Sequence, residues 1–287
     1  MTAENPSLRI LVTGGSAGLG AAIAGAAAAR GHRVLAGGRR FAAPQQSLKS
    51  PNLFEMTLDV SDQASCSGTI HQMTRLFGGV DVVVANAGVA CAGPFEEISI
   101  DEFERVMEVN FFGAVRIAKA ALPTMREARS GLIMAVSSLS GLIGLPGDSA
   151  YAASKHALEG AFESLSAEVA RFGIRVALIE PGGVATELMG SARHPSRKAD
   201  SPYGAFNNAI RNRSSAATGA DPSDIAEEIV SIIESRDGAL RHPVGDQARS
   251  VVRSLSELTG EARAAFARKA AGMEWWLNPE ETRRPAD

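Results

Sequence analysis

The chain has 287 residues, 45% of them hydrophobic and 21% charged, with a formal net charge of −3. This length is enough for a large hydrophobic core, and the charge gives no general attraction for nucleic acid or for an anionic membrane. The Ala-rich run at residues 21–29 is too short to span a membrane, and residues 1–7 lack the basic and apolar parts of a secretory signal, so we expect a cytoplasmic protein.

Short apolar runs alternate with helical patterns along the first two thirds of the chain. Strands are predicted at residues 9–13, 33–36, 53–58, 81–85, 131–137 and 174–180. Helices are predicted at residues 20–31, 62–77, 100–126 and 150–172, and Pro123 is expected to kink or end the third of them. Six buried strands separated by helices predict βαβ crossovers. The fold class is therefore a single-domain, doubly wound parallel sheet, a Rossmann fold, with helices on both faces.

The C-terminal third has a different character, although we assign residues 1–287 to one domain. Residues 187–220 are polar and too long for an ordinary connection, which predicts a substrate loop or lid with a short helix. A helix is predicted at residues 222–235, a strand at 240–244 and a helix at 247–271. In the tail, residues 272–287, Trp275 and Trp276 are expected to fasten the chain to the body or to another subunit, with a substrate-pocket role as the alternative. Residues 278–287 are expected to be frayed.

A glycine-rich turn joins the first predicted strand to the first helix. Glycine lets the backbone approach a pyrophosphate closely, and the N-terminus of the helix offers N–H groups and a positive dipole. The spacing is Gly-x-x-x-Gly-x-Gly and not the commoner Gly-x-Gly-x-x-Gly, but its place at the first βα turn is where dinucleotides bind. We predict that a dinucleotide contacts Gly14, Ser16, Gly18, Leu19 and Gly20.

The end of the second predicted strand carries two arginines. A carboxylate that would bind the ribose hydroxyls of NAD is expected here, about 20 residues past the glycines, but the sequence reads Gly-Gly-Arg39-Arg40. Guanidinium groups fit a 2′-phosphate. The sequence therefore predicts a preference for NADP over NAD, and the alternative is an ordinary basic turn that faces solvent.

A tyrosine and a lysine are separated by four positions in the predicted helix at residues 150–172. That spacing places Tyr151 and Lys155 on one face, about one turn apart. A phenol keeps its proton to about pH 10, and a nearby cation lowers that pKa, which makes the pair a candidate proton donor and acceptor. The alternative is a solvated helix face.

Taken together, these motifs resemble the short-chain dehydrogenase/reductase family over roughly residues 8–190. The matching residues fall in the family's order: Thr13-Gly14-x-x-x-Gly18-x-Gly20, Asp59-Val60, Asn86-Ala87-Gly88, Asn110, Ser138, Tyr151-x-x-x-Lys155, Pro181-Gly182 and Thr186. Glu180-Pro-Gly and Arg241-His-Pro-Val-Gly look most like the branch of hydroxysteroid, retinol and general alcohol dehydrogenases.

The resemblance implies roles for four catalytic residues. Tyr151 would exchange a proton with the substrate oxygen while a hydride moves to or from the nicotinamide. Lys155 would lower the Tyr151 pKa and hold the nicotinamide ribose, and Ser138 would hydrogen-bond the substrate oxygen, where charge develops. Its spacing from Tyr151 selects Ser138 over Ser137. Asn110 would hold a water that links the lysine to solvent; by itself it indicates a helix kink or an exposed amide.

The resemblance also implies the remaining cofactor contacts. Asp59 and Val60 would contact the adenine, although Asp59 alone is equally a helix N-cap candidate. Asn86, Ala87 and Gly88 would form the turn at the adenosine ribose. The nicotinamide carboxamide would be held by Thr186 and the backbone near Val184, after Pro181 and Gly182.

We therefore expect an NADP(H)-preferring oxidoreductase that acts on a ketone, an aldehyde or a secondary alcohol. A non-catalytic dinucleotide sensor on the same fold is the alternative. From the resemblance we expect a homodimer or homotetramer formed through the helices near residues 100–126 and 150–172. The two cysteines and five histidines show no ligand spacing, so neither a disulfide framework nor a metal site is predicted.

The substrate cannot be identified from the residues expected to line its pocket. Leu142, Ile143, Leu145 and Pro146 indicate an apolar wall. The predicted lid is basic, which favours either an anionic substrate or a solvated loop. Its basic residues are Arg193, Arg197, Lys198, Arg211 and Arg213.

Overall fold

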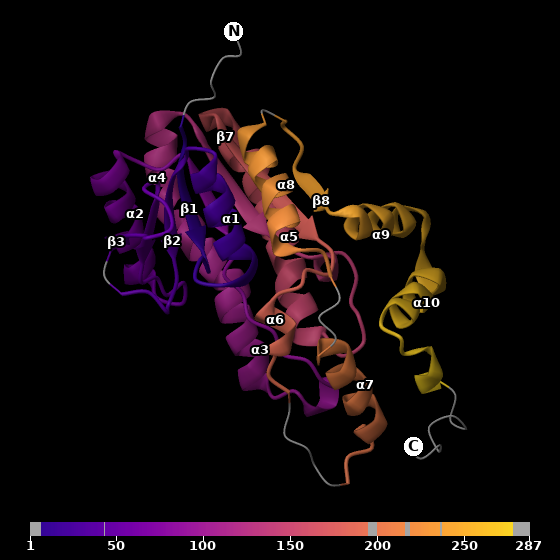
Figure 1. Cartoon of the computed structure of the whole chain (residues 1–287). Helices are drawn as coiled ribbons and strands as arrows, with labels where there is room; N and C mark the ends of the chain where they lie inside the picture. The colour runs from indigo at the N-terminus through magenta and orange to yellow at the C-terminus, as the bar shows by residue number, and fades with distance from the viewer. Residues whose placement is uncertain (1–6, 43, 195–199, 216–218, 236, 278–287) are drawn as a thin grey trace.

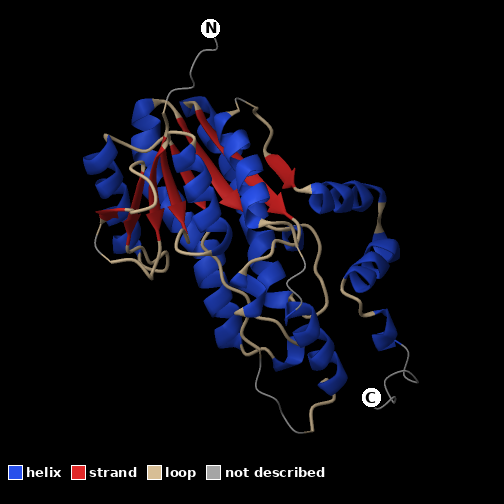
Figure 2. Ribbon diagram, in the orientation of Figure 1, coloured by secondary structure: helices blue, strands red, loops and turns tan. Residues whose placement is uncertain are grey.

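A twisted sheet of eight strands, in the order β3-β4-β2-β1-β5-β6-β7-β8, forms the centre of the computed structural model (Figure 2). The structure describes residues 7–42, 44–194, 200–215, 219–235 and 237–277. Seven strands are parallel: β1 (Arg9–Thr13), β2 (Arg33–Gly37), β4 (Leu53–Met56), β5 (Val82–Ala85), β6 (Gly131–Val136), β7 (Ile174–Pro181) and β8 (Arg241–Val244). The predicted doubly wound parallel sheet is confirmed. A short strand that was not predicted, β3 (Gln45–Gln46), pairs antiparallel with β4.

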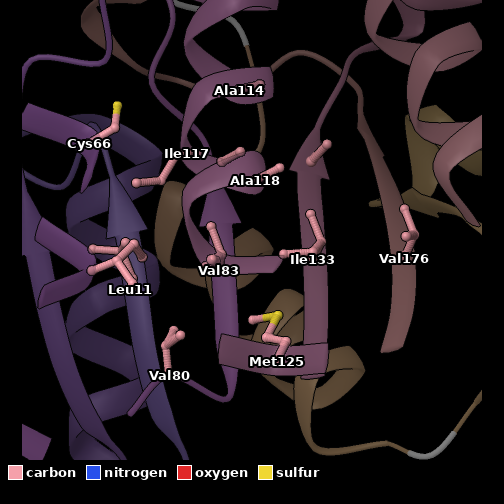
Figure 3. Close-up of a cluster of buried hydrophobic side chains, with 14 of the residues drawn as sticks. Leu11, Cys66, Val80, Val83, Ala114, Ile117, Ala118, Met125, Ile133 and Val176 are labelled. Atoms are coloured by element: carbon pink, nitrogen blue, oxygen red, sulfur yellow. The ribbon is translucent and has the colours of Figure 1, made fainter. Parts of the chain in front are cut away.

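Helices cover both faces of the sheet, because its strands are apolar on both sides. One face is packed by α1 (Gly18–Ala29) and α8 (Pro222–Glu234). The other is packed by α2 (Gln63–Phe77), α4 (Gly113–Ala128) and α5 (Ser149–Val169). Figure 3 shows Ile117, Ala118 and Met125 of α4 against the strand residues Val83 and Ile133. Among the described residues, no helix is both long and apolar enough to cross a membrane.

The predicted helix at residues 100–126 has an interruption where none was expected. It begins as α3 (Ile100–Met107), which Ser99 caps by accepting a hydrogen bond from the Glu102 N–H. A π-turn at Glu108–Phe112 follows, in which the Gly113 N–H bonds to the Glu108 carbonyl, and α4 then continues to Ala128. Of the two effects expected of Pro123, a kink or the end of the helix, the second is wrong, because Pro123 lies inside α4. The π-turn is where Asn110 lies.

The predicted C-terminal helix at residues 247–271 is two helices, α9 (Asp246–Glu257) and α10 (Gly260–Ala270). Leu258 and Thr259 are extended and Gly260 has φ 51°, so the helical path is broken there. A 3₁₀ turn at Glu274–Leu277 follows. Shorter 3₁₀ turns lie at Phe95–Glu97, Leu139–Gly141 and Ala170–Phe172. Residues 278–287, expected to be frayed, lie outside the described residues.

The strand order reverses between β1 and β5, and this reversal fixes where a ligand can bind. The chain builds outward from β1 through β2 to β4 and then returns to place β5 on the other side of β1. In doubly wound sheets the crevice for a ligand opens at the carboxyl ends of the strands at such a switch point. The helices α6 (Glu187–Gly190) and α7 (Gly204–Ser215), from the predicted lid, lie beyond those carboxyl ends (Figure 1).

Candidate active site

At the switch point, Thr13 joins the ends of β1 and β5. Its Oγ1 accepts hydrogen bonds from the backbone N–H groups of Asn86 and Ala87, each at 3.0 Å. The Asn86 side-chain amide donates in return to the Thr13 carbonyl oxygen at 2.9 Å. The glycine-rich turn and the Asn86-Ala87-Gly88 turn, both predicted cofactor contacts, are therefore fixed side by side.

The glycines of the first turn are required by close packing. Gly14 and Gly18 have φ 68° and 52°, a region that favours glycine. A Cβ on Gly14 would lie 2.9 Å from the Ala87 Cα, and one on Gly20 would lie closer than 3.0 Å to the Asn86 amide nitrogen and the Gly14 carbonyl oxygen. Leu19, in the first turn of α1, is partly buried against the core.

The N-terminus of α1 suits an anion. Its cap residue Ala17 has no side chain that could accept a hydrogen bond from the first turn, and no acidic residue lies in that turn. The N–H groups of a helix N-terminus and its positive dipole then face the crevice without a side-chain partner. The residues present fit a pyrophosphate here.

The two arginines lie at the end of β2, next to this turn. Both are exposed, and the Arg40 guanidinium is 3.9 Å from the Glu187 carboxylate. A Cβ on Gly38 would lie 3.0 Å from Ser16 Oγ, so the arginine-bearing turn contacts the glycine-rich turn. The position is compatible with the predicted 2′-phosphate contact.

Asp59 and Val60 lie just after β4 in the chain. Asp59 is not the cap of α2, because Asp62 has that role and accepts from the Ala64 N–H. Hydrogen bonds from Ser61 hold the Asp59 pKa below its ordinary value, and the positive charge of Arg39 adds to this effect. Val60 is buried against Gly113, where a Cβ would lie 2.6 Å from Val60 Cγ2.

Tyr151 and Lys155 lie one turn apart on α5, and both are buried. The Lys155 ammonium nitrogen is 5.6 Å from the centroid of the Tyr151 ring and donates to the Val136 carbonyl oxygen at 2.7 Å. The Tyr151 hydroxyl is hydrogen-bonded with the Ser138 side chain. The structure thus brings Ser138, Tyr151 and Lys155 together. It leaves Ser137 buried at the end of β6, with a side chain that has no hydrogen-bond partner among the described residues.

The predicted effect of Lys155 on the Tyr151 pKa is wrong for the protein alone. Burial raises the pKa of Tyr151 to about 12; the Ser138 hydrogen bond opposes this rise and the negative charge of Asp148 adds to it. Burial also lowers the pKa of Lys155 to about 8, while the charge of Glu159 opposes that change. The physical reason is that desolvation disfavours the charged form of both groups, and it is the largest cause of both shifts.

Asn110 is neither an exposed amide nor merely a kink. It is 1% exposed in the π-turn. Its Oδ1 accepts from the Val89 N–H at 2.8 Å, and its Nδ2 donates to the Val89 carbonyl and to Ser154 Oγ, each at 3.0 Å. Asn110 therefore connects the chain after β5 to α5. Ser154, which accepts this bond, was not predicted as a site residue; its place inside Tyr151-x-x-x-Lys155 was the available signal.

The segment after β7 lies against the glycine-rich turn. The isolated bridge between Val184 and Ala220 and the hydrogen bond from the Gly183 N–H to Gln247 Oε1, at 2.7 Å, hold its backbone. A Cβ on Gly182, next to Pro181, would lie 2.7 Å from that same oxygen. Thr186 lies over Gly18, whose Cβ position is 3.4 Å from the threonine side chain.

An apolar cluster covers Tyr151 from the side of the predicted lid. It joins Tyr151 to Phe206 and Ile210 of α7 and to Met273 of the tail. Trp276 stacks on Tyr203 and meets Phe206 edge-on, so the tail is fastened to the predicted lid.

Two of the basic residues of the lid form ion pairs within the molecule. Arg193 pairs with Glu102 at 2.9 Å and Arg213 pairs with Asp148 at 2.9 Å. The predicted basic residues Arg197 and Lys198 lie outside the described residues. A hollow of about 400 Å³ lies at the opposite, amino-terminal edge of the sheet, beside Leu8 and Gly131, and contains none of the predicted site residues. Among the described residues, no cluster of side chains is suited to a metal ion.

Comparisons with known proteins agree with this geometry. The model of the short chain dehydrogenase family matches residues 9–197. Oxidoreductase BOA17 of Botryotinia fuckeliana is 38% identical over 83% of this chain and 88% of its own length. A short-chain dehydrogenase from Streptomyces avermitilis has a TM-score of 0.76 at 32% identity over 98% of this chain and all of its own. An alcohol dehydrogenase from the archaeon Thermococcus sibiricus, complexed with 5-hydroxy-NADP, has a TM-score of 0.66 at 26% identity over 81% of this chain and 94% of its own.

Proposed function

Because the chain belongs to the short-chain dehydrogenase family and is an NAD(P)-dependent oxidoreductase, we propose that it transfers a hydride between NADPH and a ketone, an aldehyde or a secondary alcohol. The observation that carries the proposal is the buried Tyr151 hydroxyl, hydrogen-bonded with the half-buried Ser138 side chain, with the buried Lys155 one turn along the same helix. A protein that only sensed a dinucleotide would not need a buried phenol bonded to a hydroxyl, so we favour the enzyme.

In the proposed complex the cofactor lies across the switch point. Gly14, Ser16, Gly18, Leu19 and Gly20 hold the pyrophosphate at the uncapped N-terminus of α1. The adenosine is placed by Asp59, Val60, Asn86, Ala87 and Gly88. Lys155 holds the nicotinamide ribose, and Thr186 and the backbone near Val184, Gly182 and Pro181 hold the carboxamide. The bound nicotinamide supplies or accepts the hydride.

Tyr151 acts as the proton donor in reduction. Because its pKa is raised to about 12 by burial, the phenol is protonated at neutral pH and is ready to give its proton to a carbonyl oxygen as charge develops there. The Ser138 hydroxyl donates a second hydrogen bond to the same oxygen. Lys155 stabilises the tyrosinate that remains, and Asn110 holds α5 in register with the chain after β5.

The preference for NADPH is supported by the end of β2. Arg39 and Arg40 are exposed beside the glycine-rich turn, and the 3.9 Å separation of Arg40 from Glu187 is too long for a strong ion pair. A 2′-phosphate would give these guanidinium groups a better partner. The related archaeal alcohol dehydrogenase, complexed with 5-hydroxy-NADP, is consistent with this choice.

We also propose that residues 187–220 form a substrate lid on one domain spanning residues 1–287, that the tail from residue 272 fastens it, and that the protein is cytoplasmic. A homodimer or homotetramer through α3, α4 and α5 would cover Phe95, Ile100 and Phe112, which are 73%, 70% and 45% exposed. The apolar cluster over Tyr151 supports an apolar substrate.

The test of the proposed function is Tyr151→Phe, assayed as NADPH oxidation against a panel of ketones and aldehydes. The variant is expected to lose turnover and to keep NADPH binding, measured by fluorescence titration. Tyr203→Phe is the matched control, because it removes the only other tyrosine hydroxyl, which bonds to the exposed Glu96. Retained turnover in Tyr151→Phe would contradict the acid–base role.

A further inference from the structure

Helix α7 lies directly on the turn that precedes the helix bearing Tyr151. Gly147, in the middle of that turn, has φ 86°, and a Cβ there would lie 2.9 Å from Ile210 Cγ1. Ile210 is fully buried and belongs to the apolar cluster around Tyr151. Only a glycine allows α7 to approach this closely, so the contact between the lid helix and the start of α5 depends on the residue at position 147.

The same face of α7 carries an arginine three residues after Ile210, and it reaches the same turn. One nitrogen of the Arg213 guanidinium donates to Asp148 Oδ1 at 2.9 Å and to the Pro146 carbonyl oxygen at 3.2 Å. The Asp148 side chain is 9% exposed and that of Arg213 is 26% exposed. Asp148 immediately precedes α5, but its carboxylate does not cap the helix. This carboxylate is therefore committed to the arginine.

The negative charge of Asp148 acts on Tyr151, which is one turn further along. Asp148 is among the causes of the raised Tyr151 pKa, after burial. The other ionisable or hydrogen-bonding groups beside the phenol are Ser138 and Lys155. The elements packed over it from the lid and the tail contribute apolar side chains to their shared cluster. Burial raises the pKa of Asp148, and Arg213 is the cation that faces this carboxylate, favours its charged form and offsets its charge.

We propose that Arg213 and Asp148 are positioning residues for proton transfer, which complete the electrostatic environment of Tyr151 only when α7 is docked on the turn at residues 146–148. The inference rests on the acid–base role of Tyr151. It makes the lid part of the chemistry as well as a cover, because seating α7 places a positive charge against the carboxylate that otherwise opposes ionisation of the phenol.

The test measures Tyr151 directly, because the chain has only two tyrosines. In a Tyr203→Phe background, the ¹³Cζ resonance of labelled tyrosine reports the ionised fraction of Tyr151 alone. Asp148→Asn leaves the Arg213 charge unopposed. Removing a charge this close to Tyr151, or removing the partner that offsets it, shifts the titration midpoint of Tyr151 by on the order of half to one pH unit. From a starting pKa of about 12, the ionised fraction at pH 11 then rises about three- to fivefold.

Two further variants test the direction of the change in the ionised fraction of Tyr151. Arg213→Met leaves the carboxylate unopposed and is expected to decrease the ionised fraction at pH 11, and the double variant is expected to return close to the parent. Arg193→Met is the matched control, because it removes a lid ion pair that faces Glu102 and not Tyr151; it should leave the titration unchanged. Far-ultraviolet circular dichroism at each pH confirms folding, and Arg213→Met decides the matter if Asp148→Asn does not fold.

The proposal is overturned if the two single variants leave the titration midpoint of Tyr151 unchanged or shift it in the same direction. It is also overturned if Arg193→Met shifts that midpoint as far as Arg213→Met does. A second readout is the acid limb of the pH profile for NADP⁺-dependent alcohol oxidation, which should shift in the same sense as the titration. If wild type turns over no alcohol or ketone, the proposed function fails, whereas the titration still decides whether the ion pair acts on Tyr151.

Discussion

Replacing Gly20 by alanine tests whether the first turn is packed as tightly as the structure shows. A Cβ at this position would lie closer than 3.0 Å to the Gly14 carbonyl oxygen and to the Asn86 side-chain nitrogen. The oxygen is backbone and Asn86 is held by its bond to the Thr13 carbonyl, so neither can move without disturbing the turn. We expect Gly20→Ala to lower both stability and affinity for NADPH.

The magnitude follows from two opposing effects. Alanine in a helix gains up to about 1 kcal/mol over glycine, and overpacking of a close contact costs about 1–3 kcal/mol. Gly25 offers the matched control, because it is exposed in the same helix and a Cβ there would have nothing within 4 Å. Gly25→Ala should stabilise by about 0.5–1 kcal/mol. Because the helix gain is common to both variants, they should differ by the overpacking cost, about 1–3 kcal/mol, or roughly 2–6 °C in Tm.

Thermal unfolding and fluorescence titration with NADPH measure the two effects. Movement of the Gly14 carbonyl by the new methyl group should weaken NADPH by at least about tenfold, which corresponds to about 1.4 kcal/mol. The reasoning is refuted if Gly20→Ala has the same Tm and the same dissociation constant for NADPH as Gly25→Ala.

Three other variants examine separate parts of the molecule. Arg39→Ala should raise the KM for NADPH by about tenfold or more and leave that for NADH nearly unchanged; equal losses would mean that the arginine does not contact the 2′-phosphate. Glu180→Gln should remove a pH dependence of the free energy of unfolding. Burial raises the Glu180 pKa to about 7, so the folded state holds this proton more tightly than the unfolded state. The resulting stabilisation is present below about pH 4.5 and is lost as pH rises through about 7. Urea unfolding at pH 5 and pH 8 should show wild type losing up to about 3 kcal/mol relative to the variant over that range, and parallel curves would contradict the assignment. Asn110→Leu leaves the Val89 N–H and carbonyl without their partner and should cost about 2–4 kcal/mol in urea unfolding; a loss below about 1 kcal/mol would mean that water replaces the amide.

The centre of the sheet could be predicted from the sequence because β1, β2, β5 and β6 are short, mostly apolar runs followed directly by glycine, asparagine or serine. β1 was predicted with its observed bounds, Arg9–Thr13. The break between α9 and α10 was missed because Thr259-Gly260 occurs inside an otherwise helical pattern. The π-turn was missed because nothing in the order of residues 108–112 separates it from an α-helix.

Contacts distant in the sequence account for the rest of the site. The pairing of Thr13 with Asn86 and that of Asp148 with Arg213 span 73 and 65 positions, and neither pair is visible as local spacing. The direction of the Tyr151 pKa was wrong for a related reason. Spacing showed the cation one turn away, but not that burial would disfavour the charge on both groups.

The π-turn makes the length of this stretch as important as its composition. It contains one residue more than an α-turn, so deleting one residue from 108–112 would restore an ordinary α-turn and leave the faces of α3 and α4 in their present register. A deletion within α4 itself would instead rotate one part of the helix by about 100° and turn its buried face away from the sheet. Val106, now fully buried in the cluster that contains Ala150, should therefore stay packed against α5 after a deletion in the turn. A deletion scan across residues 100–128 should find its best-tolerated positions at the turn.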